Sequence, residues 1–151
     1  MNIKIETISP STIAYYRRYG AYGVENIETM EKLKSWATTN NYMDENSIIL
    51  GIAHDNVQLT KPENCRYDAC IVLGNNTVIG NDTITIGKIS GGKYAVFTIE
   101  HTASAMQKAW SEIFPTISKS KYEVDYNRPI MERYIAKLVA NHYCEICVPI
   151  L

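Results

Sequence analysis

The sequence of 151 residues has no long apolar run and no excess of either charge. No stretch approaches the roughly 20 apolar residues of a membrane span, and the N-terminal segment alternates like a strand, unlike the apolar core of a signal peptide. Lysine and arginine number 15 against 16 aspartates and glutamates, so the basic clusters that bind phosphates are missing. These absences predict a cytoplasmic protein that binds neither membranes nor nucleic acid directly.

Motifs for metal, cofactor or nucleophilic chemistry are missing too. The three histidines lack metal-ligand spacing, and neither a Gly-rich phosphate loop nor a Ser-His-Asp order occurs. Of the four cysteines, Cys144 and Cys147 have CxxC spacing but lie within an expected strand, where positions three apart face opposite sides. We therefore expect four reduced core cysteines, no metal and no cofactor.

Tyrosine is the unusual component, with 11 residues beside two tryptophans and two phenylalanines. Its side chain has a flat apolar body and a polar tip, which suits it to line pockets. The length is that of one domain, spanning residues 1–151.

Hydrophobic periodicity predicts an α+β fold. Expected strands cover residues 2–8, 12–19, 47–52, 65–73, 83–89, 93–99, 122–125 and 144–150, and Gly74-Asn75-Asn76 ends the fourth of them. One helix is expected from Val24 to a stop at Asn40, and a second from Thr102 to a stop at Pro115. Residues 130–140 are expected to be partly helical.

The order strand-strand-helix-strand-strand thus occurs twice, at about residues 1–75 and 82–151. The halves also correspond in residues: Ala14-Tyr15-Tyr16 matches Ala95-Val96-Phe97, and Tyr67-Asp68-Ala69 matches Cys144-Glu145-Ile146. Asp68 and Glu145 therefore hold equivalent places. This predicts a pseudo-twofold cleft between the repeats, with one acid from each.

Glu145 is the most informative acid. The last strand is apolar on both faces, which predicts a central strand buried on two sides. A carboxylate there must be hydrogen-bonded, paired with a neighbouring Arg or Lys, protonated, or waiting for a cation. Asp68 likewise either pairs with Arg66, caps a loop or faces the cleft.

The motifs together resemble the GyrI-like family, the effector-binding domain attached to some AraC-type and MerR-type regulators and also found alone. The resemblance covers nearly the whole chain and rests on residues 16–22, Trp36, 51–56, 66–71, 91–97, 122–124 and 145–150. It implies two tandem SHV2 repeats, an antiparallel sheet, two main helices and a ligand cleft. No helix-turn-helix segment is expected in this sequence, so it resembles the standalone form of the domain.

The resemblance also implies a site. Family members bind bulky, often cationic, aromatic compounds, and a glutamate in the final strand, matched by Glu145, neutralises the ligand. Aromatic residues stack around it. The candidate ligand-binding residues are Glu145, Asp68, Trp36, Trp110, Tyr15, Tyr19, Tyr67, Tyr94 and Phe97, of which the two tryptophans are equally suited to the core.

Three functions follow from the resemblance. The first is a standalone protein that binds cationic, amphipathic aromatic small molecules, alone or with a separate regulator. The second is an inhibitor that binds DNA gyrase. The third is a hydrolase of cyclopropanoid genotoxins that uses Glu145; the family's tryptophan after the second helix falls at about Ile117 here, which weighs against it. Binding ranks first, since an acid in an aromatic cleft suffices for it.

Overall fold

The computed structural model describes residues 1–74 and 83–151, so the expected turn residues Asn75 and Asn76 lie outside the described residues. The strands are β1 (Lys4–Ile8), β2 (Ser11–Tyr19), β3 (Ile48–Ala53), β4 (Arg66–Leu73), β5 (Thr85–Ile89), β6 (Gly92–Glu100), β7 (Met131–Ile135) and β8 (Tyr143–Pro149). The helices are α1 (Glu25–Thr39), α2 (Ala103–Ser118) and the short α3 (Ala136–Ala140), with a 3-10 turn η1 at Pro62–Asn64.

All eight strands form one antiparallel sheet in the order β1-β6-β8-β7-β3-β4-β2-β5. Strands β1 to β4 of the first repeat correspond, in the same order, to β5 to β8 of the second. If each strand is exchanged for its counterpart, the strand order of the sheet is reversed. The pseudo-twofold axis therefore falls between β3 and β7, the two central strands. The α+β class and the duplicated strand-strand-helix-strand-strand arrangement are as predicted, and β8 is an internal strand between β6 and β7.

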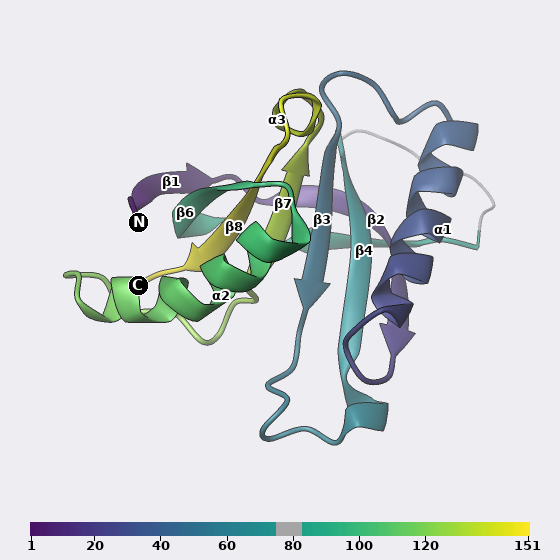
Figure 1. Cartoon of the computed structure of the whole chain (residues 1–151). Coiled ribbons are helices and arrows are strands. Elements are labelled where there is room, and N and C mark those ends of the chain that lie inside the picture. The colour runs from purple at the N-terminus through teal and green to yellow at the C-terminus, as the bar shows by residue number, and fades with distance from the viewer. Residues whose placement is uncertain (75–82) are drawn as a thin grey trace.

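The sheet is buried on both faces, but by different partners. On one face α1 packs against β2 and β4, and α2 packs against β6 and β8 (Figure 1). The opposite face is the inside of the curled sheet, where side chains from strands near both ends, such as Ile89 and Tyr94, join one core cluster. Because alternate residues of a strand face opposite sides, each strand contributes to both layers.

The starts of the two main helices carry favourable local features. Glu25 and Glu28 lie in the first turn of α1, where they complement the helix dipole. In α2 the Thr102 side chain accepts a hydrogen bond from the Ala105 backbone N–H and caps the helix. These local features fix the start of both helices close to the predicted residues.

The predicted stop of the second helix at Pro115 is wrong, because α2 continues to Ser118. Proline lacks the N–H that would bond the carbonyl four residues earlier. Beyond it, however, Ile117 is only 2% exposed and packs in the core beneath α2. Burying such a side chain contributes about 2 kcal/mol, which helps offset the lost hydrogen bond in the last turn.

Two other segments differ from the pattern. The expected strand at 122–125 makes a single bridge, between Val124 and Ile150. The segment 130–140 contains a full strand, β7, before the short helix α3. This strand pairs with both β3 and β8 and so lies at the centre of the sheet.

The four cysteines are free and buried, as predicted. The Sγ atom of Cys144 contacts the sulfur of Met106 on α2, whereas Cys147 lies in the core inside the curl. Among the helices of the described residues, we find none with the length and apolar character needed to cross a membrane.

Candidate ligand-binding site

A cavity of about 700 Å³ lies over the two central strands, on the face that carries the helices. Its floor is formed by residues of β3, β4 and β7, one wall by α1, and the opposite wall by α3 and His101. The volume falls in the range of sites for drug-sized molecules. The cavity sits at the pseudo-twofold axis, where the two repeats meet, as predicted, but the expected pair of acids, Asp68 and Glu145, does not line it.

Glu132 is the acid at the floor of this cavity. It lies on β7 next to Tyr134, and the alternation of the strand directs both side chains to the helix face. The Tyr134 hydroxyl donates a hydrogen bond of 2.5 Å to Oε2 of Glu132. Within the described part of the chain, Glu132 forms no ion pair with a lysine or arginine, and Oε1 has no hydrogen-bond partner.

The protonation of Glu132 reflects its surroundings. Burial raises the pKa of the carboxyl above its ordinary value, and the Tyr134 hydrogen bond and nearby His101 offset only part of this effect. The pKa values of Tyr134 and Tyr67 are also raised, first by burial and then by the Glu132 charge. Glu132 is therefore a carboxylate that gains from a cationic partner.

Tyr67 lies over Gly51, the strand partner of Glu132, because Gly51 has no side chain. Gly51 on β3 is the direct pairing partner of Glu132 on β7. A Cβ atom at Gly51 would lie 2.8 Å from the Tyr67 hydroxyl oxygen, so the ring of Tyr67 lies across β3 above the glycine. The hydroxyl is thus roughly one strand spacing, ~5 Å, from the backbone that carries Glu132.

The rest of the lining is mostly apolar, with a charged rim. Apolar side chains come from α1, α3, the α1–β3 connection and β3: Ile27, Met30, Met43, Ile49, Ala136 and Val139. At the rim, the Lys34 Nζ lies 4.0 Å from Glu31 Oε1, and both side chains are largely exposed. The rim charges balance each other, which leaves Glu132 as the unbalanced charge.

Glu145 lies on the opposite face of the sheet and is already paired. The Arg133 guanidinium donates from Nε to Glu145 Oε1 at 2.9 Å and makes two further bonds, of 2.8 and 2.9 Å, to Glu6. Glu145 is 4% exposed. Of the states expected for a carboxylate buried at this position, the structure has the one in which a neighbouring arginine is the partner. Glu145 does not line the 700 Å³ cavity.

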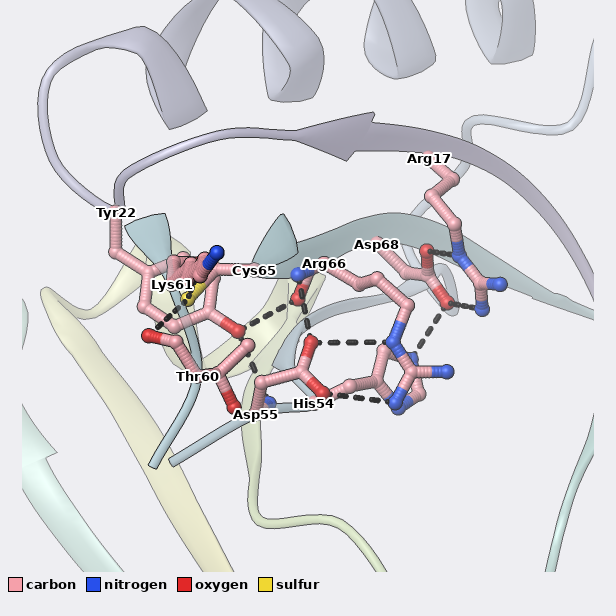
Figure 2. A network of polar contacts seen from close by, with 9 residues as sticks. All are labelled: Arg17, Tyr22, His54, Asp55, Thr60, Lys61, Cys65, Arg66 and Asp68. Carbon is pink, nitrogen blue, oxygen red and sulfur yellow. Dashed lines mark hydrogen bonds and ion pairs between the residues drawn. The ribbon is translucent and has the colours of Figure 1, made fainter. Parts of the chain in front are cut away.

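Asp68 has an equivalent environment in the first repeat (Figure 2). Arg17 bonds both carboxylate oxygens, at 2.7 and 2.8 Å, and His54 Nε2 lies 2.6 Å from Oδ2. Burial pushes the pKa of Asp68 up, but the bonds from Arg17 and His54 together hold it below its ordinary value. Pairing with Arg66, one of the three alternatives for Asp68, does not occur, because Arg66 bonds Asp55 instead.

The predicted aromatic residues are dispersed, and among the nine candidates Tyr67 alone lines the large cavity. Trp36 stacks on Tyr42 beneath α1, and Trp110 packs against the core beneath α2. Tyr94 and Phe97 are 1% exposed, in the cores of opposite faces. Tyr15 borders a smaller hollow beside Arg17, and Tyr19 is 63% exposed.

Sequence reasoning missed Glu132, Tyr134 and His101. The signal for the first two was weak: Tyr134 and Ile135 favour strands, but Met131-Glu132-Arg133-Tyr134 does not alternate between apolar and polar residues, and the segment is predicted to be partly helical. His101 carried no such signal, since only the fold brings the start of α2 beside β7.

A curled antiparallel sheet with two main helices, and an apolar cavity whose floor carries one acid without a cationic partner at the junction of the repeats, defines a small-molecule-binding domain of the effector-binding class. A family model described as a GyrI-like small molecule binding domain matches residues 1–151. The chain belongs to this GyrI-like family.

Relatives cover nearly the full length of the chain. The "SPbeta prophage-derived putative transcriptional regulator YosT" of Bacillus subtilis (strain 168) is 42% identical over 151 residues, or 99% of each chain. The DNA gyrase inhibitor of Escherichia coli (strain K12) is 24% identical over 149 residues, which cover 97% of this chain and 93% of the inhibitor.

Solved structures share the fold. SAV2435 bound to tetraphenylphosphonium has a TM-score of 0.69 and 16% identity, with 100% of this chain and 94% of that chain covered. EcmrR in its DNA complex has a TM-score of 0.74 and 12% identity, with 99% of this chain covered. This chain spans 57% of the EcmrR chain.

Proposed function

We propose that this protein captures cationic, amphipathic aromatic molecules in the cavity above β3 and β7, with Glu132 as the counter-ion. The observation that carries the proposal is an acid in an apolar cavity without a lysine or arginine partner among the described residues. Because Glu145 is already paired with Arg133, we assign the counter-ion role to Glu132 on the neighbouring strand β7. Tyr67 and Tyr134 provide the aromatic faces that favour a cation beside the acid.

The charge of the site supports the ligand class. A cation about 4 Å from a carboxylate gains about 4 kcal/mol at an effective dielectric of 20, before desolvation is subtracted. Glu31 and Lys34 balance each other at the rim, so they add little net field. The structural relative SAV2435 was solved with tetraphenylphosphonium, a bulky aromatic cation.

A binding titration with matched variants tests the proposal. A cationic rhodamine or acridine dye is expected to bind wild-type protein with micromolar affinity, and Glu132→Gln is expected to weaken it at least about tenfold, or about 1.4 kcal/mol. Glu145→Gln, which changes an acid on the other face, is the control and should leave affinity within about twofold. Equal affinity of wild type and Glu132→Gln would refute the proposal.

Inhibition of DNA gyrase is a second candidate, supported by the relatives named as gyrase inhibitors. A supercoiling assay separates the two functions, because small-molecule binding predicts no effect on gyrase. Loss of supercoiling at stoichiometric protein would favour the second candidate, and unchanged supercoiling at large excess would remove it.

A further inference from the structure

Two oxygen atoms in the cavity lack hydrogen-bond partners among the described residues, and both can accept a hydrogen bond. One is Oε1 of Glu132, since the Tyr134 hydroxyl occupies Oε2. The other is the hydroxyl of Tyr67. Every fully buried side-chain oxygen or nitrogen in the described part of the chain has a hydrogen-bond partner. The two oxygens without a partner are therefore not fully buried, and they are accessible from the cavity.

The two oxygens face the same volume. Tyr67 lies across β3 above Gly51, and Gly51 is directly opposite Glu132 in the β3–β7 ladder. The carboxylate and the hydroxyl therefore flank one space near the floor of the cavity. The charge of Glu132 contributes to the raised pKa of Tyr67, after burial, as expected for two groups that lie close together.

A ligand without N–H groups would leave these acceptors unmatched. A quaternary ammonium or a phosphonium ion gains the Coulomb attraction of Glu132 but offers no donor to either oxygen. Leaving a desolvated acceptor unpaired is costly, and hydrogen bonds to charged groups are the stronger kind. A cation with two N–H groups can satisfy both acceptors at once.

We propose that the cavity selects N–H-bearing cations, such as protonated primary or secondary amines and amidines, over fully alkylated cations of similar size. Glu132 Oε1 and the Tyr67 hydroxyl are the two acceptors that read the N–H groups, and Gly51 is the positioning residue for Tyr67. This selectivity rests on the proposed cation-binding function and adds a chemical class to it.

The test compares naphthylmethylammonium with its N,N,N-trimethyl counterpart and with neutral naphthylmethanol, by isothermal titration calorimetry at neutral pH. The trimethyl compound is easier to desolvate, so without the two acceptors it should bind at least as tightly. Selection of N–H groups predicts about tenfold tighter binding of the primary ammonium. Tyr67→Phe should reduce this ratio several-fold. The control is Tyr143→Phe, at the start of β8 and outside the lining of the cavity, and it should leave the ratio unchanged.

The outcomes separate the two proposals. Equal or tighter binding of the trimethyl compound, or a ratio that Tyr67→Phe leaves unchanged, overturns the selectivity while cation binding stands. Binding of naphthylmethanol as tight as that of both cations, or no binding of either cation, overturns the proposed function and the selectivity with it.

Discussion

At the scale of single residues, the sheet carries two kinds of acid, one fully buried and one half-buried. Glu145 and Asp68 point into the curl, and each has an arginine partner from an adjacent strand, Arg133 or Arg17. Glu132 points to the helix face and has a tyrosine hydroxyl in place of a cation. The first two acids have an arginine as their charge partner, whereas the third has no lysine or arginine partner among the described residues.

This difference predicts opposite effects on stability. Because burial raises the pKa of Glu132 in the folded state, the folded protein binds that proton more tightly than the unfolded chain does. Its contribution to stability is therefore lost as the pH rises from the ordinary carboxyl pKa through the raised one. At neutral pH Glu132→Gln removes this cost, and we expect a higher melting temperature than for wild type.

Glu145→Gln should do the reverse. It weakens a buried charge-assisted bond to Arg133, which keeps only Glu6 as an ionic partner, and we expect a loss of about 1–3 kcal/mol in the free energy of unfolding. Urea denaturation of the three proteins at neutral pH measures both effects. A Glu132→Gln variant less stable than Glu145→Gln would contradict the assignment of a structural role to one acid and a ligand role to the other.

Ligand affinity should also depend on pH. Protonation of Glu132 removes its charge, so binding of a permanently charged dye should weaken as the pH falls through the raised pKa of this group. Fluorescence titrations at values from about pH 8 to about pH 5 should show this weakening in the wild-type protein and much less of it in Glu132→Gln.

At the scale of elements, the packing of β3 against β4 sets the floor of the cavity. Gly51 is the residue of β3 over which Tyr67 crosses, and a side chain there meets the Tyr67 hydroxyl. The strand itself is paired on both sides, by β4 and β7, so it can accept a small side chain without losing its hydrogen bonds.

Gly51→Ala is therefore expected to displace Tyr67 and to weaken amine binding about fivefold to tenfold, with a loss of stability of no more than about 1–3 kcal/mol from overpacking. Calorimetric titration together with thermal denaturation checks both quantities. The control is Gly87→Ala: Gly87 is a strand glycine next to Tyr15, outside the large cavity. Unchanged amine affinity in Gly51→Ala would contradict the positioning role.

The elements also show what sequence could and could not predict. The duplication, the sheet and the central place of the last strand followed from periodicity, because alternation and length are local properties. The choice of acid did not, because it depends on which acid has an arginine within reach. Arg133 is next to Glu132 in sequence, yet it points to the other face and bonds Glu145 and Glu6, which lies on β1 far away along the chain.

At the scale of the whole molecule, each repeat completes the sheet of the other. β1 of the first half pairs with β6 of the second, and β5 of the second half pairs with β2 of the first. The core inside the curl also draws side chains from both halves. Neither half can bury its apolar surface alone.

Fragments 1–74 and 83–151 are therefore expected to be unfolded or aggregated when separate and to form the native sheet when mixed. The dispersion of amide signals in NMR spectra of the single fragments and of the mixture measures this directly. A dispersed spectrum from one fragment alone would contradict the interdependence of the halves.

The most direct test of the central claim is a crystal structure of the protein with a bound cationic aromatic amine. The account predicts the charged nitrogen within hydrogen-bond distance of Glu132 Oε1 and the Tyr67 hydroxyl, between α1 and β7, with the Arg133–Glu145 pair undisturbed. A ligand bound inside the curl, with its cation beside Glu145 or Asp68 and the arginine displaced, would contradict it.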